Sequence, residues 1–188
     1  FDQTGLYAYG QQPSTLLWNL ARLAECLLEY APHEELTQVL SGFPALYETE
    51  LDAAWLRRLG VTPRTPDEDR NLRRAVTLFM EISRIPFHLL PFDWYGGKAG
   101  ADRALQGPRK DFYEMPEFAE ARKLLETYAP LPHVAPDHPY CTGARPCDML
   151  IMTVETLWDE LAEKDNWRAL DDKLAEIGLM ADALGTRP

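Results

Sequence analysis

Four side chains of types that bind metal ions lie within one proline-rich segment, spaced H-x4-H-x2-C-x5-C: His133, His138, Cys141 and Cys147. Thiolate sulfur and imidazole nitrogen are ligands that zinc prefers in proteins. The paired cysteines two residues apart that mark many structural zinc sites are absent, however. Zinc is therefore the minor alternative, and the main interpretation is a loop that packs His138 and Tyr140 against helices.

The same cysteines would suit nucleophilic catalysis, but the signal is weak. Cys147 lies at the start of a predicted helix, where the helix dipole would lower the pKa of its thiol. Cys26 falls in an amphipathic stretch and is predicted to be a small core residue. No oxyanion-hole motif, G-x-x-x-x-G-K-[ST] motif or G-x-G-x-x-G motif is present. The residues by themselves therefore predict no catalytic residue and no self-contained active site.

Large aromatic side chains fall mostly on apolar helical stripes. We predict that four tryptophans lie in the core: Trp18, Trp55, Trp158 and Trp167. The segment 93–97 is different, because it joins an acid and two large rings to a pair of glycines. We interpret it as a structural motif in which Asp93 accepts backbone N–H groups and Gly96 and Gly97 turn the chain sharply.

Charge and composition exclude several classes of function. The chain has 188 residues, with 19 Lys and Arg against 30 Asp and Glu, and a formal net charge of −11. Nucleic acids and anionic membranes select for an excess of basic residues, so we expect neither as a partner. No apolar run approaches the ~20 residues of a membrane helix. Three cysteines do not suggest a disulfide framework, and we expect a cytoplasmic, bacterial protein.

The elements that must position these residues are helices. Apolar residues recur at helical spacing over residues 13–30, 33–40, 44–59, 66–83, 116–128, 146–162 and 166–184. Thr65 and Pro66, followed by acids at 67–69, form a strong helix start. Residues 98–114 and 129–146 are predicted to be irregular. No segment alternates with a period of two, so the predicted fold class is all-α.

A family resemblance begins in the opening segment. Residues 5–13 (GLYAYGQQP) and 18–23 (WNLARL) resemble the G-R-Y-A-Y-G-N-Q-P and W-N-L-x-R-L pattern of the selenoprotein O family (SelO, YdiU). The sequence departs from that pattern at Leu6 and Gln11. Residues 43–60 and 86–97 also look like this family, and Trp18, Asn19, Asp93 and Trp94 belong to its structural motifs. The first ~100 residues carry most of the resemblance.

The resemblance implies a protein-kinase-like fold that transfers AMP from ATP to Ser, Thr or Tyr hydroxyls of proteins, with Mg²⁺. Residues 1–97 would be C-lobe helices that begin in the activation-segment region, and 98–188 a helical extension packed on them. The family's nucleotide-binding and metal-binding residues precede the G-R-Y-A-Y segment, so none can be placed on this sequence. Tyr7, Tyr9 and Gln12 would border the protein-substrate groove.

Because the chain begins at Phe1 rather than Met, we expect a fragment that works with a missing N-terminal nucleotide-binding half and with protein substrates. No cofactor is expected in the fragment itself, which is predicted to be inactive alone. The alternative is a stand-alone helical protein-interaction module without catalysis.

Overall fold

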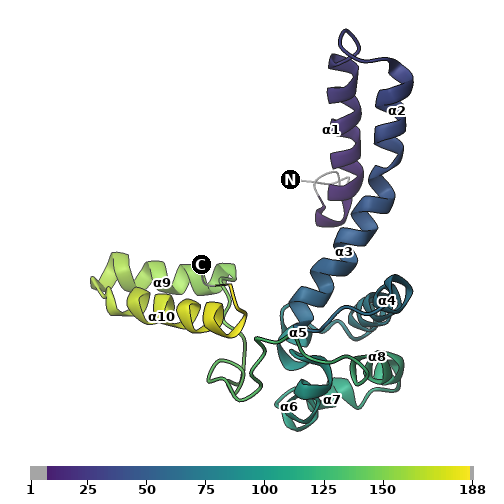
Figure 1. The fold of residues 1–188 in the computed structure, drawn as a ribbon. Helices are drawn as coiled ribbons and strands as arrows, with labels where there is room; N and C mark the ends of the chain where they lie inside the picture. Colours follow the sequence, from purple (N-terminus) through teal and green to yellow (C-terminus); the bar gives the residue numbers. More distant parts are fainter. Residues whose placement is uncertain (1–7, 187–188) are drawn as a thin grey trace. The chain divides into compact units, whose positions relative to one another are not determined.

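The computed structural model describes residues 8–186, and it divides the chain into two compact units that meet between residues 52 and 53 (Figure 1). The described residues form helices and no strand, with one isolated antiparallel bridge between Val61 and Pro130. The all-α prediction is confirmed. The boundary predicted at residue 97, between kinase-like helices and a C-terminal extension, is a different one and stays a prediction. In the described part of the chain, none of the helices has the length and apolar character needed to cross a membrane.

The first unit contains a short 3₁₀ helix, η1 (Tyr9–Gln11), then α1 (Gln12–Cys26), α2 (His33–Ser41) and the beginning of α3 (Phe43–Leu59). Helices α1 and α2 lie side by side (Figure 1). The helix predicted over residues 13–30 ends at Cys26, because the backbone then tightens into turns in which Tyr30 N–H donates to the Leu27 carbonyl at 2.9 Å.

Neither α1 nor α2 contains a buried residue. Trp18 is 61% exposed, and Cys26 is also exposed. The prediction that both are core residues was therefore wrong. An apolar stripe predicts which face of a helix is suited to burial, but burial itself requires an element packed on that face, and α2 leaves much of the stripe uncovered.

The second unit begins with the end of α3 and continues with α4 (Pro66–Ser83), α5 (Leu89–Asp93), η2 (Gly97–Gly100), α6 (Ala101–Gln106), α7 (Lys110–Tyr113), η3 (Pro116–Phe118), α8 (Ala119–Leu125), α9 (Ile151–Lys164) and α10 (Arg168–Ala183). Helix α4 begins as its sequence predicts. The Thr65 hydroxyl accepts from the Glu68 backbone N–H at 3.4 Å, and the Glu68 carboxylate accepts from the Thr65 N–H at 3.1 Å. This reciprocal capping box satisfies two N–H groups that the helix itself leaves without partners.

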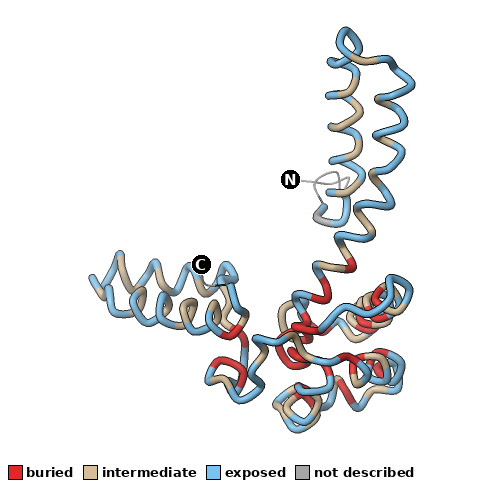
Figure 2. The backbone as a smooth tube through the Cα atoms, in the orientation of Figure 1, coloured by how far each residue is buried: buried red, intermediate tan, exposed pale blue. Residues whose placement is uncertain are grey.

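The core of the second unit is aromatic. Phe79 of α4 meets Phe118 with ring centroids 4.7 Å apart, and Trp94 lies 5.2 Å from Phe118 and 5.9 Å from Tyr113. All four side chains are at most 3% exposed. Figure 2 shows the buried residues concentrated along α4, α5 and α8 and at the end of α3. Tilted and edge-to-face ring pairs of this kind contribute beyond the area they bury.

Two segments differ from their predictions. Residues 98–114 were predicted to be irregular, but they contain η2, α6 and α7. Their helices are only four to six residues long, which is too short for a periodic pattern to be visible in the sequence. Residues 146–150 were predicted to open a helix, but α9 begins only at Ile151.

Helices α9 and α10 form a hairpin (Figure 1). Ala183, at its end, packs in a cluster with Phe92, Tyr95, Tyr140 and Cys141, which joins the hairpin to the rest of the unit. Trp158 and Trp167 are 68% and 60% exposed, so their predicted core positions were wrong. Trp55 is buried, as predicted.

Candidate functional site

The three side chains predicted to border a substrate groove are not brought together into a site that the structure describes. Tyr7 lies outside the described residues. Tyr9 is described only as the first residue of η1, and Gln12 is exposed at the start of α1. Their role stays a prediction. Asn19, also exposed, follows Trp18, whose ring lies 5.7 Å from the Arg22 guanidinium.

In the segment 93–97 the acid has other partners than those predicted. Asp93 is buried, and it accepts hydrogen bonds from Arg109 Nε at 2.7 Å and from the Tyr113 hydroxyl at 2.5 Å. The prediction of backbone donors was wrong, because a buried carboxylate is better compensated by a guanidinium than by neutral N–H groups. The same bonds raise the pKa of Arg109. Arg109 lies in the segment 98–114, which was predicted to be irregular, and nothing local in that segment indicated its partner.

The glycines of this motif turn the chain as predicted. Gly96 and Gly97 have φ angles of 90° and 57°, which favour glycine. A Cβ atom on Gly97 would lie 2.8 Å from the Tyr128 carbonyl oxygen. Arg103 reinforces the turn from α6, because its guanidinium donates to the carbonyls of Phe92 at 2.7 Å and Asp93 at 2.9 Å. These contacts indicate that the segment 93–97 has a structural rather than a chemical role.

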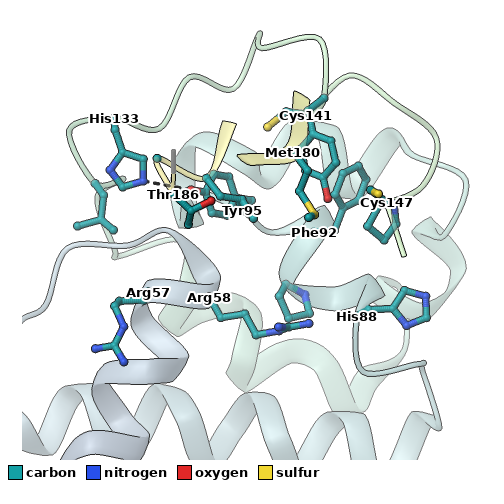
Figure 3. Close-up of a pocket in the computed structure, with 16 residues that line it drawn as sticks. Arg57, Arg58, His88, Phe92, Tyr95, His133, Cys141, Cys147, Met180 and Thr186 are labelled. Atoms are coloured by element: carbon teal, nitrogen blue, oxygen red, sulfur yellow. Dashed lines mark hydrogen bonds between the residues drawn. The ribbon is translucent and has the colours of Figure 1, made fainter. Parts of the chain in front are cut away.

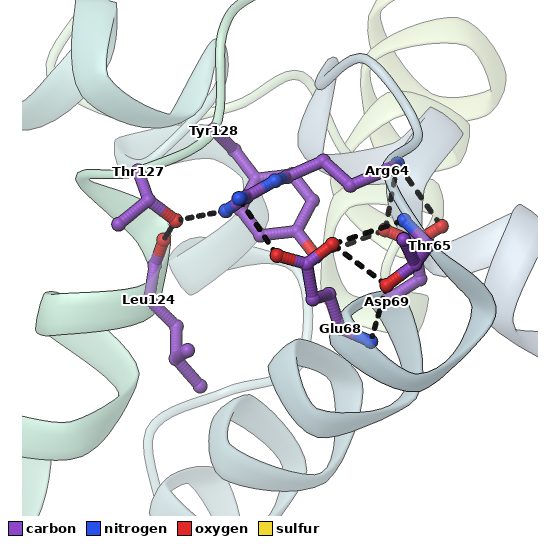
Figure 4. A network of polar contacts seen from close by, with 7 residues as sticks. All are labelled: Arg64, Thr65, Glu68, Asp69, Leu124, Thr127 and Tyr128. Atoms are coloured by element: carbon purple, nitrogen blue, oxygen red, sulfur yellow. Dashed lines mark hydrogen bonds and ion pairs between the residues drawn. The ribbon is translucent and has the colours of Figure 1, made fainter.

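A second polar network ties the start of α4 to the residues that follow α8 (Figure 4). The buried Asp69 carboxylate accepts from the Arg64 N–H at 3.0 Å and from the Tyr128 hydroxyl at 2.9 Å. The Arg64 side chain donates to Thr127 at 3.0 Å and pairs with Glu68 at 2.7 Å. Burial, followed by the Asp69 contact, raises the pKa of Tyr128. Because these groups satisfy one another, we interpret the network as structural. The sequence indicated only the helix cap.

A pocket of about 680 Å³ lies in the second unit (Figure 3). Its walls come from the end of α3, from α5, from the loop 131–147 and from the end of α10. Tyr95 lines it, with its hydroxyl 3.3 Å from His133 Nε2 and 3.4 Å from the Ala183 carbonyl oxygen. Burial raises the pKa of Tyr95 to about 12, so this phenol is neutral at physiological pH.

Cys141 and Cys147 both line this pocket, but neither has the environment of a nucleophile. Burial raises the pKa of both thiols, and Glu176 adds to the effect at Cys147. The predicted lowering at Cys147 was wrong, because the residue precedes the N-terminus of α9 by several positions and lies in apolar surroundings. Lys173 Nζ, 3.9 Å from the Cys147 sulfur, has the smaller opposing effect.

The residues that the structure describes contain no group of three or more His, Cys, Asp and Glu side chains placed to hold a metal ion. His138 turns away to accept from the Tyr140 N–H at 3.2 Å, so the zinc arrangement of His133, His138, Cys141 and Cys147 is not formed. Mg²⁺ requires oxygen ligands, and the pocket lining contains no carboxylate. The lining of this pocket therefore offers no ligand set for Mg²⁺, and whether the chain holds a cofactor stays a prediction.

Comparison with known proteins finds a family match for residues 1–93 of the chain. Residues 1–93 match the family model described as Protein adenylyltransferase SelO. Curated relatives carry the name Protein nucleotidyltransferase YdiU. The protein of Roseobacter denitrificans is 36% identical over 89 residues, which cover 43% of this chain and 18% of the relative.

Two further relatives extend the match beyond residue 93. The YdiU protein of Ectopseudomonas mendocina is 32% identical over 117 residues (62% of this chain, 24% of the relative), and that of Bradyrhizobium diazoefficiens is 32% identical over 144 residues (71% and 28%). The chain thus spans about a fifth to just over a quarter of the length of these relatives. No solved structure matches significantly. Residues 1–93 of this chain are therefore similar to the SelO family of protein adenylyltransferases.

Proposed function

We propose that the chain is the C-terminal helical part of a kinase-like protein adenylyltransferase, which transfers AMP from ATP to Ser, Thr or Tyr hydroxyls of other proteins. The observation that carries this proposal is the SelO match over residues 1–93. The name of the relatives, nucleotidyltransferase, supports the same reaction class. An all-helical architecture is also what the C-lobe of such a fold requires.

In this proposal the chain positions other parts of the enzyme instead of holding the nucleotide. Metal-assisted transfer of phosphoryl and nucleotidyl groups depends on cations and acids gathered around the phosphates. The described residues offer no acid cluster of that kind. The groups that bind ATP and Mg²⁺ would then come from the nucleotide-binding half of the protein, and helices α1 and α3 would support them.

The test compares two proteins, the 188-residue chain and the product of its complete reading frame. Each is incubated with α-³²P-labelled ATP, Mg²⁺ and a mixture of acceptor proteins, and protein-bound AMP is measured. We expect labelling by the complete product and none by the 188-residue chain. Transfer by the 188-residue chain alone, or a complete product that holds a nucleotide-binding half and transfers nothing, would contradict the proposal.

A chimera tests the same proposal without the native upstream sequence. Residues 1–93 replace the matching segment of the Roseobacter denitrificans relative, and AMP transfer is compared with that of the unaltered relative. We expect the chimera to retain transfer. A soluble, folded chimera that has lost it would show that the segment does not perform the family's structural role.

The second candidate is a stand-alone helical interaction module without catalysis. The exposed tryptophans of the α9–α10 region, outside the family-model match, favour it. This candidate predicts that the 188-residue chain is itself the complete translated product, which the mass of the endogenous protein would determine.

A further inference from the structure

The α9–α10 hairpin carries more apolar surface than its two helices bury. Among its described residues, α9 contains no buried side chain and α10 contains only Ala183, at the joint with the core cluster. Figure 2 shows the two helices almost entirely exposed or half-buried. The side chains of Trp158, Ile151 and Leu174 are 68%, 67% and 55% exposed. Large apolar side chains that gather exposed on one element mark a site of interaction with another molecule.

The exposed apolar residues form one stripe along each helix. These two stripes are Ile151, Val154 and Trp158 on α9, and Trp167 and Leu174 on α10. In both helices the stripe lies one residue, or about 100° of rotation, after a half-buried row, since Trp158 follows Leu157 and Leu174 follows Lys173. The helices pack as an antiparallel pair joined by residues 165–167. The same rotation on two antiparallel helices brings both stripes to one side of the hairpin, which we call the hairpin face.

The hairpin is also the most acidic part of this acidic chain. Residues 151–176 contain eight acids and three bases, so a net charge of −5, out of −11 for the whole chain, falls on about a seventh of the sequence. The three bases form ion pairs within the hairpin: Lys164 with Glu160, Lys173 with Glu176 and Arg168 with Asp172. The hairpin therefore keeps an excess of negative charge that its own cations do not balance.

Two of these acids border the hairpin face. Glu155 lies one helical turn from both Ile151 and Trp158. Asp171 lies one turn from both Trp167 and Leu174. Both acids are exposed, and neither forms a hydrogen bond or an ion pair with another residue in the part of the chain that the structure describes. An apolar centre with an acidic border is complementary to an apolar surface with a basic border.

We propose that the hairpin face binds a basic amphipathic helix of a partner protein. The apolar side of that helix lies along Trp158 and Leu174, and its Lys or Arg side chains lie beside Glu155 and Asp171. A third helix laid along two packed helices buries an apolar stripe of each, and recognition of amphipathic helices commonly works in this way. The proposal does not depend on adenylyl transfer, because the hairpin lies outside the residues 1–93 that match the family model.

Charge distinguishes this partner from the other occupants of an apolar face. A second copy of the hairpin would bring its own net charge of −5 against the same acids, and an acidic helix would meet the same repulsion. A neutral apolar helix would leave Glu155 and Asp171 without a counter-charge at the border of the interface. A basic amphipathic helix satisfies both the apolar centre and the acidic border.

The exposed apolar residues of α1 do not support the same partner. Trp18 and Leu23 are 61% and 55% exposed, much like Trp158 and Leu174. However, the Arg22 guanidinium lies over the Trp18 ring, 5.7 Å from its centroid, and places a cation where a basic partner would carry its own. This pair of residues therefore provides a matched control for the hairpin face.

The test uses three fluorescein-labelled peptides as long as α10, which has 16 residues. The first is a helix with a leucine stripe flanked by lysines, the second has the same composition in an order that breaks the helical period, and the third has glutamate in place of every lysine. Binding to the 188-residue chain is measured by fluorescence anisotropy. We expect the first peptide to bind at least tenfold more tightly than the other two. Equal binding of the first two peptides, or of the first and third, would overturn the proposal, as would no binding of the first.

Matched variants locate the binding on the hairpin face. The double variant Trp158→Ala/Leu174→Ala is expected to weaken binding of the basic amphipathic peptide at least tenfold, because truncated tryptophans at the centre of an interface have large effects. The control Trp18→Ala/Leu23→Ala removes side chains of the same types and similar exposure from α1 and should leave the affinity within twofold. Thermal unfolding verifies that each variant is folded. Equal losses in the two double variants would overturn the proposal.

The acidic border is tested separately. Glu155→Gln/Asp171→Asn should weaken binding of the basic peptide about threefold or more, and this difference from the unaltered chain should shrink at high salt, which screens exposed charges. The control Glu117→Gln/Asp111→Asn changes two exposed acids outside the hairpin and should leave the affinity within twofold. If the control weakens binding as much as the border variant does, the peptide recognises the overall charge of the chain, and the proposal fails.

Sedimentation velocity of the 188-residue chain over a range of protein concentrations tests the second copy as occupant. We expect no association through the hairpin face, so that Trp158→Ala/Leu174→Ala leaves the sedimentation coefficient unchanged. A dimer that this variant dissociates would show that a second copy covers the hairpin face, and it would overturn the proposal.

Discussion

Replacing Arg109 by methionine would remove one half of a buried ion pair while keeping most of the side chain's volume. The Arg109 and Asp93 side chains are 14% and 7% exposed, and two short contacts join them, at 2.7 and 2.5 Å. In Arg109→Met the Asp93 carboxylate would remain buried with the Tyr113 hydroxyl as its side-chain partner. The variant would also lose the bond from Arg109 to the Ala144 carbonyl, at 2.8 Å.

Breaking a buried pair by removing one partner costs about 3–5 kcal/mol, because it leaves an uncompensated charge. At about 2–4 °C per kcal/mol for a chain of this size, the melting temperature should fall by about 6–20 °C. The control is Arg122→Met. Arg122 contacts Glu126 at the same 2.7 Å, but its side chain and that of Glu126 are 45% and 40% exposed. An exposed pair of that kind is worth about 0–1 kcal/mol.

The assay is urea unfolding followed by circular dichroism, for the single variants Arg109→Met, Arg122→Met and Asp93→Asn and for the double variant Asp93→Asn/Arg109→Met. Because the double variant leaves neither charge buried, it should cost less than the sum of its two single substitutions, by about 0.5–3 kcal/mol. If Arg109→Met lowers the free energy of unfolding no more than Arg122→Met does, burial does not decide the strength of the Arg109–Asp93 pair, and the structural role assigned to Asp93 is wrong.

Three further predictions concern the second unit. Gly97→Ala should lower the free energy of unfolding by about 2–5 kcal/mol, because of the positive φ at this position and overpacking against the Tyr128 carbonyl. The control Gly42→Ala, at φ −75° with its nearest contact at 3.4 Å, should lower it much less. Equal losses in chemical denaturation would refute the close approach of Gly97 to the Tyr128 carbonyl. Thr65→Ala should cost about 1 kcal/mol by removing the cap of α4, and a neutral result would show that the capping box adds nothing. Burial raises the pKa of Tyr95 and Tyr140 to about 12. Below pH 10 both phenols are neutral in the folded and the unfolded chain, but between pH 10 and 12 they ionise first in the unfolded chain, so the free energy of unfolding should fall over that window. Equilibrium unfolding at stepped pH would measure this fall, which should be less steep in the variants Tyr95→Phe and Tyr140→Phe.

The helices could be predicted where they are long and carry their own signals. Thr65 and Pro66 predict the start of α4 from local chemistry alone, and the capping box confirms it. Gly60, at φ 65°, follows the end of α3 in the left-handed conformation that favours glycine at a helix C-terminus. The helices α6 and α7 were missed because each is only one or two turns long. Such short elements are stabilised by tertiary contacts, such as Arg103 with the Phe92 carbonyl, which leave no periodic pattern.

The polar clusters show a second limit of prediction from sequence, which concerns contacts between residues far apart in the chain. Segment 93–97 was recognisable because unusual residue types are adjacent in it, but Arg109 lies 16 positions away from Asp93. Likewise, Tyr128 lies 59 positions from Asp69. Partners at such separations are brought together only by the packing of α4 on α8 and of α5 on α6. The pocket has the same origin, since its lining comes from segments as far apart as the end of α3 and the end of α10.

The exposed tryptophans show what an amphipathic pattern does and does not determine. A helix forms where its local propensity and capping allow, and the pattern then fixes which face is apolar. Whether that face is buried depends on a second surface, which the pattern does not specify. Trp55 meets Phe87, with ring centroids 5.4 Å apart, and is buried. Trp158 and Trp167 belong to equally apolar stretches, but no described residue covers them, and they stay 68% and 60% exposed. Predicted helices are therefore reliable here where predicted core positions are not, and the difference lies in the packing partner.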